Sequence, residues 1–228
     1  MNFVFIILGV IVILLLYAVY TFAYPSKTAV TNANYLFNGV KQVPFTNLET
    51  PTSTKYSIEL WIYANDVKNA SANHNTAGIA GNPNGCIFEV QTNSTSIYHL
   101  DLFNNADLGF YNTGSNTPTI VINNFPLQKW CYVVISVNKN LVDMYLDGKL
   151  IKSIKSRNSG SFPTEDSAIH FGRGNVYISG MNRITRTTDM NTALKNYLNG
   201  NAGLKMTNYG ISLSLFKDNK EQKRFDLV

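Results

Sequence analysis

The sequence predicts an all-β protein, an antiparallel sandwich of two sheets, preceded by one N-terminal transmembrane helix. Three observations support this prediction. Residues 130–137 and 141–146 both alternate with the period of a β-strand and flank a turn. An uncharged apolar run occupies residues 3–23. The chain has 228 residues, so that about 200 remain beyond this run, enough for one sandwich but too few for two domains.

The first element is the apolar run from Phe3 to Ala23. As a helix it would span about 31 Å, the thickness of the hydrocarbon of a bilayer. A cleaved signal peptide is the alternative, but such peptides begin with basic residues, and the first lysine here is Lys27. We therefore expect residues 1–24 to be a retained membrane anchor. The side chains expected to contact lipid are Phe3, Phe5, Ile6, Leu8, Ile11, Leu14, Leu15, Tyr17, Tyr20 and Phe22.

Residues 25–54 are more polar and contain Pro44 and Pro51, so we expect a tether with an initial strand. The sandwich is predicted to occupy residues 55–228. Residues 56–63 are apolar on both faces, which is typical of a strand inside a sheet. Trp61 is accordingly interpreted as a core residue rather than as a sugar platform.

The remaining elements follow in order. Residues 65–85 are predicted to be a long loop, and Asn138–Asn140 and Asp147-Gly148 to be the turns of a three-stranded meander. A short helix is expected over residues 192–198, with Asn191 or Thr192 as its cap and Asn199-Gly200 as its end. The further strands are expected at residues 86–90, 97–103, 108–111, 119–122, 169–171, 176–181 and 209–215, with residues 225–228 pairing back on the last.

Several of these segments resemble one known family. They are residues 56–63, 129–130, 133–137, 145–150, 169–172 and 176–181. In this order they are similar to the strands and turns of concanavalin A-like lectin domains of the laminin-G and pentraxin type. The resemblance implies a jelly-roll sandwich, and it extends to membrane-anchored domains found in large DNA viruses. The residues that define the fold under this interpretation are Trp61, Trp130, Asp147, Gly148 and Gly172.

Composition limits the kinds of partner. Charged residues make up 14% of the chain, the net charge is +5, and the lysines and arginines are scattered among other residues. A nucleic-acid-binding protein normally concentrates its positive charge on one face, so no nucleic-acid partner is expected. Cys86 and Cys131 are the two cysteines. They either pair in an oxidising compartment or, as we favour, remain buried free thiols.

Little in the sequence indicates catalysis. Glycoside hydrolases of this superfamily carry closely spaced acids on one strand, whereas the nearest approach here is Asp143 and Asp147, and Asp147 belongs to a turn. The histidines, His74, His99 and His170, lack the spacing of zinc ligands. The acidic residues are not clustered, so no cofactor is expected and calcium is a minor alternative.

Sugar binding requires an aromatic ring beside amide or carboxylate groups. The candidates on adjacent predicted strands are Tyr98, Asp101, Asn104, Asn105 and Asn112. The alternative is that they are ordinary strand and turn residues. A second hypothesis, drawn from laminin-G relatives, is a sulfated-glycan patch made by Arg173, Arg183 and Arg186.

These observations together predict a single-pass, non-catalytic membrane protein. Its expected role is structural, as a minor capsid or membrane-associated virion component that links an internal membrane to the shell. The expected partners are a lipid bilayer and other structural proteins, and the expected location is the inner membrane or capsid of a virion. A membrane-displayed lectin that binds glycans is the alternative, and a glycoside hydrolase is a remote one.

Overall fold

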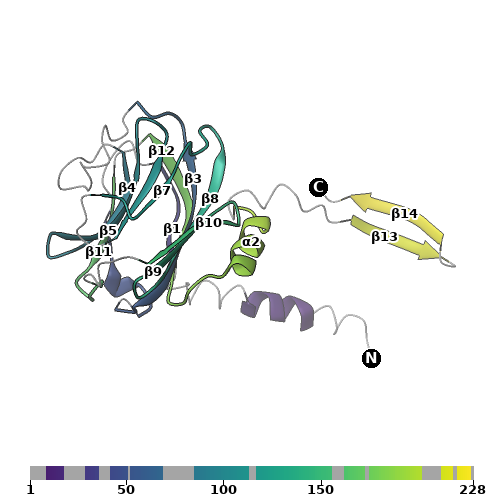
Figure 1. Ribbon diagram of the computed structural model, residues 1–228. Coiled ribbons are helices and arrows are strands. Elements are labelled where there is room, and N and C mark those ends of the chain that lie inside the picture. Colours follow the sequence, from purple (N-terminus) through teal and green to yellow (C-terminus); the bar gives the residue numbers. More distant parts are fainter. Residues whose placement is uncertain are drawn as a thin grey trace.

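The structure is a computed structural model in which two antiparallel sheets of six strands each form a sandwich (Figure 1). This finding confirms the predicted all-β, two-sheet antiparallel fold. The structure describes residues 9–17, 29–35, 42–50, 52–68, 85–112, 117–155, 162–172, 175–201, 212–217 and 220–226.

The first sheet, which we call the helix-bearing sheet, carries a short helix on its outer face (Figure 1). In spatial order its strands are β1 (Ala29–Tyr35), β12 (Val176–Ile184), β3 (Lys55–Ala64), β8 (Trp130–Asn138), β9 (Leu141–Leu146) and β10 (Lys149–Lys155). The helix is α2 (Met190–Leu198).

The second sheet covers the inner face of the first. Its strands are, in order, β2 (Gln42–Pro44), β11 (Ala168–Phe171), β4 (Cys86–Thr92), β5 (Thr95–Leu102), β6 (Leu108–Asn112) and β7 (Ile120–Ile122). A single 3-10 turn, η1 (Phe45–Asn47), follows β2. Residues 25–54, expected to be a tether with an initial strand, therefore supply one edge strand to each sheet.

The predicted meander is confirmed, because β8, β9 and β10 are consecutive neighbours in the sheet. Both turns have the expected backbone. Lys139 has φ 56° in the first turn, and Asp147 and Gly148 have φ 48° and 77° in the second. A two-residue hairpin with positive φ at both positions matches the right-handed twist of its strands.

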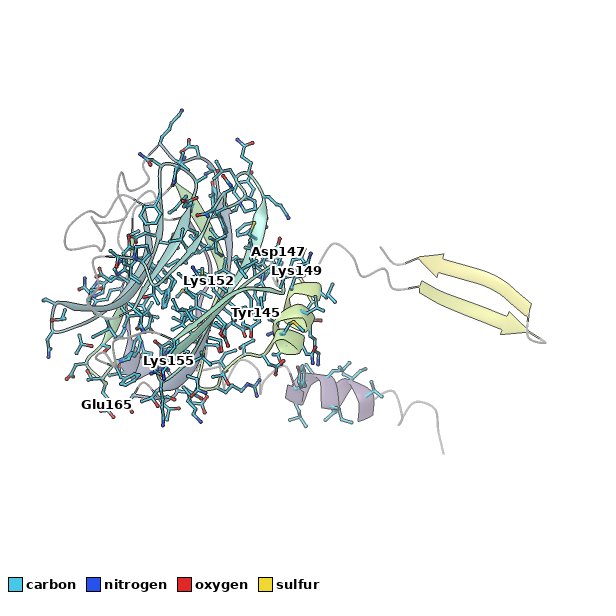
Figure 2. All side chains as sticks on the ribbon, viewed as in Figure 1. Tyr145, Asp147, Lys149, Lys152, Lys155 and Glu165 are labelled. Carbon is cyan, nitrogen blue, oxygen red and sulfur yellow. The ribbon has the colours of Figure 1, made fainter. Side chains whose placement is uncertain are left out.

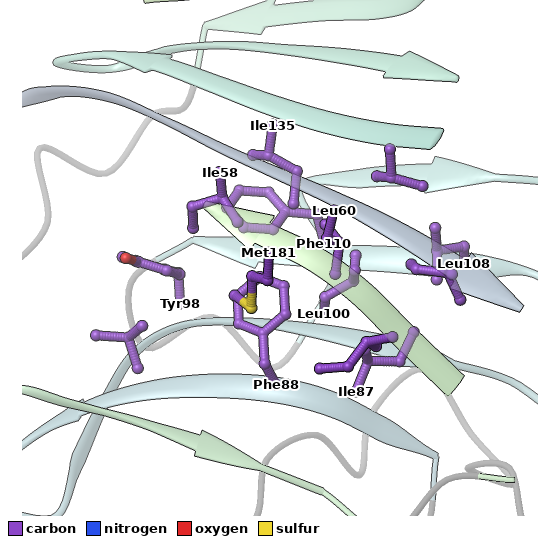
Figure 3. Close-up of a cluster of buried hydrophobic side chains, with 14 of the residues drawn as sticks. Ile58, Leu60, Ile87, Phe88, Tyr98, Leu100, Leu108, Phe110, Ile135 and Met181 are labelled. Carbon is purple, nitrogen blue, oxygen red and sulfur yellow. The ribbon is translucent and has the colours of Figure 1, made fainter. Parts of the chain in front are cut away.

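The core lies between the two sheets. Figure 3 shows Ile58 and Leu60 of β3 and Ile135 of β8 meeting Phe88 of β4 and Phe110 of β6, and all five are buried completely. Burying each such side chain contributes about 1.5–3 kcal/mol, so this interface dominates the stability of the fold. The continuous apolar pattern of β3 and β8 is explained by their central position, since both of their faces are covered.

Helix α2 begins earlier than predicted. Asp189, rather than Asn191 or Thr192, is the N-cap, and its Oδ1 accepts a hydrogen bond of 2.9 Å from the backbone N–H of Thr192. The apolar spacing identified the helix but not this cap. The end was predicted correctly, with Asn199 as C-cap and Gly200 at φ 73°.

Arg183 does not contribute to a surface patch, contrary to one of the sequence hypotheses. Its side chain is completely buried, and its guanidinium lies 5.1 Å from the ring centroids of both Phe45 and Tyr56. Strand β12 turns this residue inward, towards the loop after η1. Arg186 is exposed, and Arg173 lies outside the described residues.

A short helix occupies residues 9–17 near the N-terminus, and its large side chains from Val10 to Tyr17 are all exposed. Among the described residues no helix combines the length and the hydropathy needed to cross a bilayer. Four of the expected anchor residues, Ile11, Leu14, Leu15 and Tyr17, lie in this helix. The others, Phe3, Phe5, Ile6, Leu8, Tyr20 and Phe22, lie outside the described residues.

The C-terminal strands form a two-stranded sheet of their own, apart from the sandwich (Figure 1). Strand β13 (Ser212–Lys217) pairs with β14 (Lys220–Asp226), and Leu213 lies opposite Phe225. The predicted return pairing is thus present, although it begins at Lys220 rather than at Phe225.

Both cysteines are free and buried, as favoured from the sequence, with Cys86 on β4 and Cys131 on β8. Burial raises the pKa of the Cys131 thiol to about 11 and that of Cys86 well above its usual value. We predict that neither thiol reacts with a disulfide reagent at pH near 8 in the native protein, whereas both react after unfolding in urea. Rapid labelling of either thiol in the folded state would contradict the structure.

Candidate functional site

The five residues proposed for glycan contact do not meet at one surface. Tyr98 is buried in the core, where its ring stacks on Tyr56 at 5.5 Å between centroids. Asn112 pairs with Tyr98 across β5 and β6 and is also buried. Asp101 is three residues from Tyr98 on β5 and therefore faces the opposite side of the sheet. Asn104 and Asn105 are exposed in the turn before β6.

Asp101 instead joins a buried polar cluster on the outer face of the second sheet, with Glu89, His99 and Tyr111. The His99 ring stacks on Tyr111 at 4.1 Å, and its Nε2 lies 3.8 Å from Asp101 Oδ2. Burial lowers the pKa of His99 to about 4, so the ring is neutral near pH 7. Within the described parts of the chain, no three His, Cys, Asp or Glu residues assemble into a metal site. Because all four side chains are covered, this cluster is not an accessible ligand site.

The outer face of the helix-bearing sheet holds an accessible pocket of about 240 Å³. We call it the amide pocket. It is lined by Glu59, Trp61, Tyr132, Gly180, Asn182, Asn196, Asn199 and Gly200. Strand β3 directs Glu59 and Trp61 to this face, β12 contributes Gly180 and Asn182, and α2 with its end forms the opposite wall.

A break in the regular register of β12 gives the pocket its shape. Ser179 lies opposite Trp61, and Asn182 opposite Glu59, so the partner strand carries one extra residue between these pairs. Gly180 has φ 57° in this bulge, a conformation that glycine adopts easily. The bulge brings the Asn182 side chain onto the pocket face, where its Nδ2 donates a hydrogen bond of 3.0 Å to the Gly180 carbonyl.

Glu59 forms the floor of the pocket and is almost fully buried. Its Oε2 accepts hydrogen bonds from the Tyr132 hydroxyl (2.8 Å) and from Asn196 Nδ2 (3.0 Å). Its Oε1 accepts a third, of 2.8 Å, from the Thr188 hydroxyl. These donors are neutral, and no lysine or arginine forms an ion pair with Glu59 in the part of the chain that the structure describes. Burial, and then the Glu59 carboxylate, raise the pKa of Tyr132, so this hydroxyl keeps its proton.

Trp61 forms the aromatic wall. Its ring lies 5.2 Å from Tyr132 and 5.8 Å from Tyr197 of α2, and only 9% of its surface is exposed. Its interpretation as a packed residue is therefore correct, although its ring also borders the pocket. With aromatic rings against it, Trp61 shapes the pocket more than it offers a free face to a ligand.

A more accessible set of rings lies beside the pocket. Tyr177, Tyr63 and Trp130 are direct partners across β12, β3 and β8, and we call them the aromatic row. The Tyr63 ring lies 6.2 Å from Tyr177 and 5.6 Å from Trp130. Tyr177 is 41% exposed and the other two are half-buried. Tyr63 and Trp61 are two residues apart on β3, so the row and the pocket share one face.

Glu59, Asn182, Asn196 and Asn199 were not among the ligand-binding residues predicted from the sequence. One signal was present for Glu59, because it is a charged residue in an otherwise apolar strand. The asparagines gave no signal, since about one residue in eight of this chain is Asn.

The Asp147 carboxylate is held by contacts with the neighbouring strand β8 and with Lys129. Its Oδ1 accepts a hydrogen bond of 2.9 Å from the Tyr132 N–H, and its Oδ2 lies 3.2 Å from Lys129 Nζ. This environment accounts for the acid in the turn without a catalytic role.

The sandwich is similar in fold to solved binding domains of botulinum neurotoxins. The serotype D binding domain aligns with a TM-score of 0.56 at 15% identity, over 74% of this chain and 43% of that chain. The receptor-binding domain of neurotoxin D gives 0.56 at 18%, over 75% and 45%. The serotype D ligand-binding domain in complex with N-acetylneuraminic acid gives 0.54 at 15%, over 76% and 43%. At this identity the similarity shows the fold.

The chain thus spans less than half the length of these neighbours. No curated protein matches it significantly in sequence. Residues 37–189 match the family described as the concanavalin A-like lectin/glucanases superfamily. This segment covers more than half of the chain and contains most of both sheets. The protein therefore belongs to the concanavalin A-like lectin/glucanases superfamily.

Proposed function

We propose that this domain is a non-catalytic binding module that recognises a neutral saccharide at the amide pocket and the aromatic row. The observation that carries the proposal is the presence of both kinds of sugar-binding group on one face. Asn182 and Asn199 offer amide groups in the pocket, and Tyr177 offers an exposed ring beside it. Saccharide sites combine oriented polar groups with apolar contact surface in this way.

The charge of the pocket supports a neutral ligand. Glu59 places a carboxylate at the floor, and its hydrogen-bond partners are neutral. An acidic sugar would bring a second negative charge into a poorly solvated site, which is unfavourable. One neurotoxin neighbour was solved with N-acetylneuraminic acid. We expect the present pocket to disfavour such an acid.

The lining of the pocket supports binding without hydrolysis. Among its described lining residues, Glu59 is the one carboxylate, whereas most glycosidases place two carboxyl groups on either side of the bond that they cleave. We also propose that binding needs no metal, so that chelation of divalent cations leaves it unchanged.

A glycan array probed with the 228-residue chain in detergent tests this function. We predict binding to neutral glycans, and at least about tenfold weaker binding to sialyllactose than to lactose-type ligands of the same core. Tyr177→Ala and Asn199→Ala should each weaken binding by a similar factor, because each removes one exposed contact group.

Asn104→Ala is the matched control, since Asn104 is an exposed amide in the turn before β6, on the second sheet. It should bind like the unmodified chain. A preference for acidic glycans, or loss of binding in Asn104→Ala with none in Asn199→Ala, would contradict the proposed site.

We further propose that residues 1–24 anchor the module in a bilayer as a single-pass segment. What favours this is the helix at residues 9–17, whose large apolar side chains are all exposed. Resistance of the membrane-bound chain to extraction by alkaline carbonate would support the anchor.

The structural role expected from the sequence, a virion component that ties an internal membrane to a shell, uses the same anchor but a different partner. The partner would be a protein on the aromatic row rather than a sugar. An absence of binding on the glycan array, together with cross-linking of Tyr177→Cys to a shell protein in particles, would favour this structural role over glycan binding.

A further inference from the structure

At the floor of the amide pocket, the Glu59 carboxylate and the Tyr132 hydroxyl offer a ligand acceptors but no hydrogen. Glu59 is 5% exposed and lines the pocket together with Tyr132. A carboxylate only accepts hydrogen bonds, and a phenol hydroxyl has a single hydrogen to donate. Tyr132 donates that hydrogen to Glu59 Oε2 at 2.8 Å, so its own oxygen is left as an acceptor. A ligand group that binds to these two side chains must therefore supply a hydrogen.

The Glu59 carboxylate can accept one more hydrogen bond. A carboxylate has about four acceptor sites, two on each oxygen. Tyr132 and Asn196 occupy two sites on Oε2, whereas the Thr188 hydroxyl occupies one on Oε1. Within the described part of the chain, no further side chain donates to this carboxylate. Because Glu59 borders the pocket, the remaining site on Oε1 serves a ligand, and its charge strengthens the bond that the ligand forms.

This carboxylate is oriented before a ligand arrives, because its hydrogen-bond donors are themselves fixed. The backbone N–H of Thr188 donates a hydrogen bond of 3.0 Å to the Ser136 hydroxyl. Asn196 belongs to α2, and the stacking of Tyr197 on Trp61 holds this helix against the sheet. Binding therefore does not have to order the acceptor, which favours affinity.

The amides beside the floor favour a hydroxyl as the group that binds there. Asn196 donates one Nδ2 hydrogen to Glu59, and Asn182 donates one to the Gly180 carbonyl oxygen at 3.0 Å. An amide nitrogen carries two hydrogens, so each asparagine keeps a second one for a ligand. A hydroxyl can donate to Glu59 and accept from such an amide at the same time. An ammonium group cannot accept, and an ether or carbonyl oxygen cannot donate.

We infer that the amide pocket holds its saccharide by one unsubstituted hydroxyl, which donates its hydrogen to Glu59 Oε1. This inference rests on the proposed function and narrows the class of ligand to sugars whose hydroxyl at that ring position is free rather than methylated, sulfated or phosphorylated. Glu59 is then the residue that determines specificity. A sugar that lacks this hydrogen forfeits a hydrogen bond to a charged group and leaves the carboxylate incompletely satisfied.

The test scans the hydroxyls of neutral sugars as inhibitors of the binding of the 228-residue chain to the glycan array. The probes are the methyl glycosides of glucose, galactose and mannose and their monodeoxyfluoro analogues, because fluorine replaces a hydroxyl without supplying a hydrogen. We expect one ring position at which fluorine weakens inhibition at least about tenfold, and changes within about threefold at the others. In Glu59→Gln the loss at that position should fall to about threefold or less, because the amide replaces one acceptor oxygen by a donor.

Glu165→Gln is the matched control, since Glu165 is an exposed carboxylate in the loop before β11, away from α2 (Figure 2). It should keep the inhibition profile of the unmodified chain. If urea unfolding shows that Glu59→Gln is not folded, Tyr132→Phe takes its place. This variant removes one donor from Glu59 and should enlarge the loss at the same ring position, because the carboxylate then binds the ligand hydroxyl more strongly.

The outcomes separate this inference from the proposed function. A flat profile in the unmodified chain overturns the inference and leaves saccharide binding intact. The same holds for a profile that neither the Glu59 nor the Tyr132 variant changes, and for array binding that none of the methyl glycosides inhibits. An array on which the chain binds no neutral glycan overturns the proposed function and the inference together.

Discussion

Gly172→Ala is expected to lower the free energy of unfolding by at least about 3 kcal/mol, a large share of the stability of a typical domain. A Cβ on Gly172 would lie 1.8 Å from the Cys86 carbonyl oxygen and 2.6 Å from its carbon. Both are backbone atoms of the neighbouring strand, so no side-chain rotation relieves the clash. Strand β11 would have to separate from β4, where Phe171 pairs with Phe88 in the core. Urea unfolding followed by tryptophan fluorescence measures the loss.

Gly200→Ala is the matched control. Gly200 has φ 73°, and among the described residues beyond its two chain neighbours no atom lies within 4 Å of the point where a Cβ would stand, so alanine there costs backbone strain of about 1–2 kcal/mol. Gly172 carries no such positive φ, and its cost comes from the close approach alone. Equal losses in the two variants would show that the contact with Cys86 is not the cause.

Arg183→Ala is expected to cost about 3 kcal/mol or more. Its Nη1 donates to the carbonyl oxygens of Glu49 and Thr50, at 3.3 Å each, and its guanidinium packs against Phe45 and Tyr56. Alanine removes these contacts and leaves a cavity beside two carbonyl groups that have lost a donor. Thermal and urea unfolding of the purified variant measure the effect.

Two further variants separate the causes. Arg183→Lys keeps the charge but cannot reach two carbonyls and pack flat on two rings, so it should recover less than half of the loss. Arg186→Ala, on the exposed continuation of β12, should change stability by no more than about 0.5 kcal/mol. Similar small effects in Arg183→Ala and Arg186→Ala would restore the idea of an arginine surface patch.

The sequence determined the features that depend on neighbouring residues. The β8–β10 meander, the Asp147-Gly148 turn and the end of α2 at Gly200 were predicted correctly, because strand alternation and the conformational freedom of glycine act within a few residues. The separate directions of Tyr98 and Asp101 also follow from strand alternation. The sequence did not indicate whether the Tyr98 or the Asp101 side chain points into the core. The structure places Tyr98 in the core, so the predicted glycan-binding residues do not share one surface.

The candidate site was decided by the tertiary structure alone. Glu59 and Asn196 are 137 residues apart in sequence, yet they share a hydrogen bond at the floor of the amide pocket. Their meeting requires α2 to pack on β3 and β8, and the Gly180 bulge to bring Asn182 round to the same face. No local preference encodes such contacts, because they arise from which surfaces bury each other. The burial of Arg183 could not be predicted from the sequence for the same reason. It arises because β12 packs beneath the loop after η1, which encloses the charged side chain in the core.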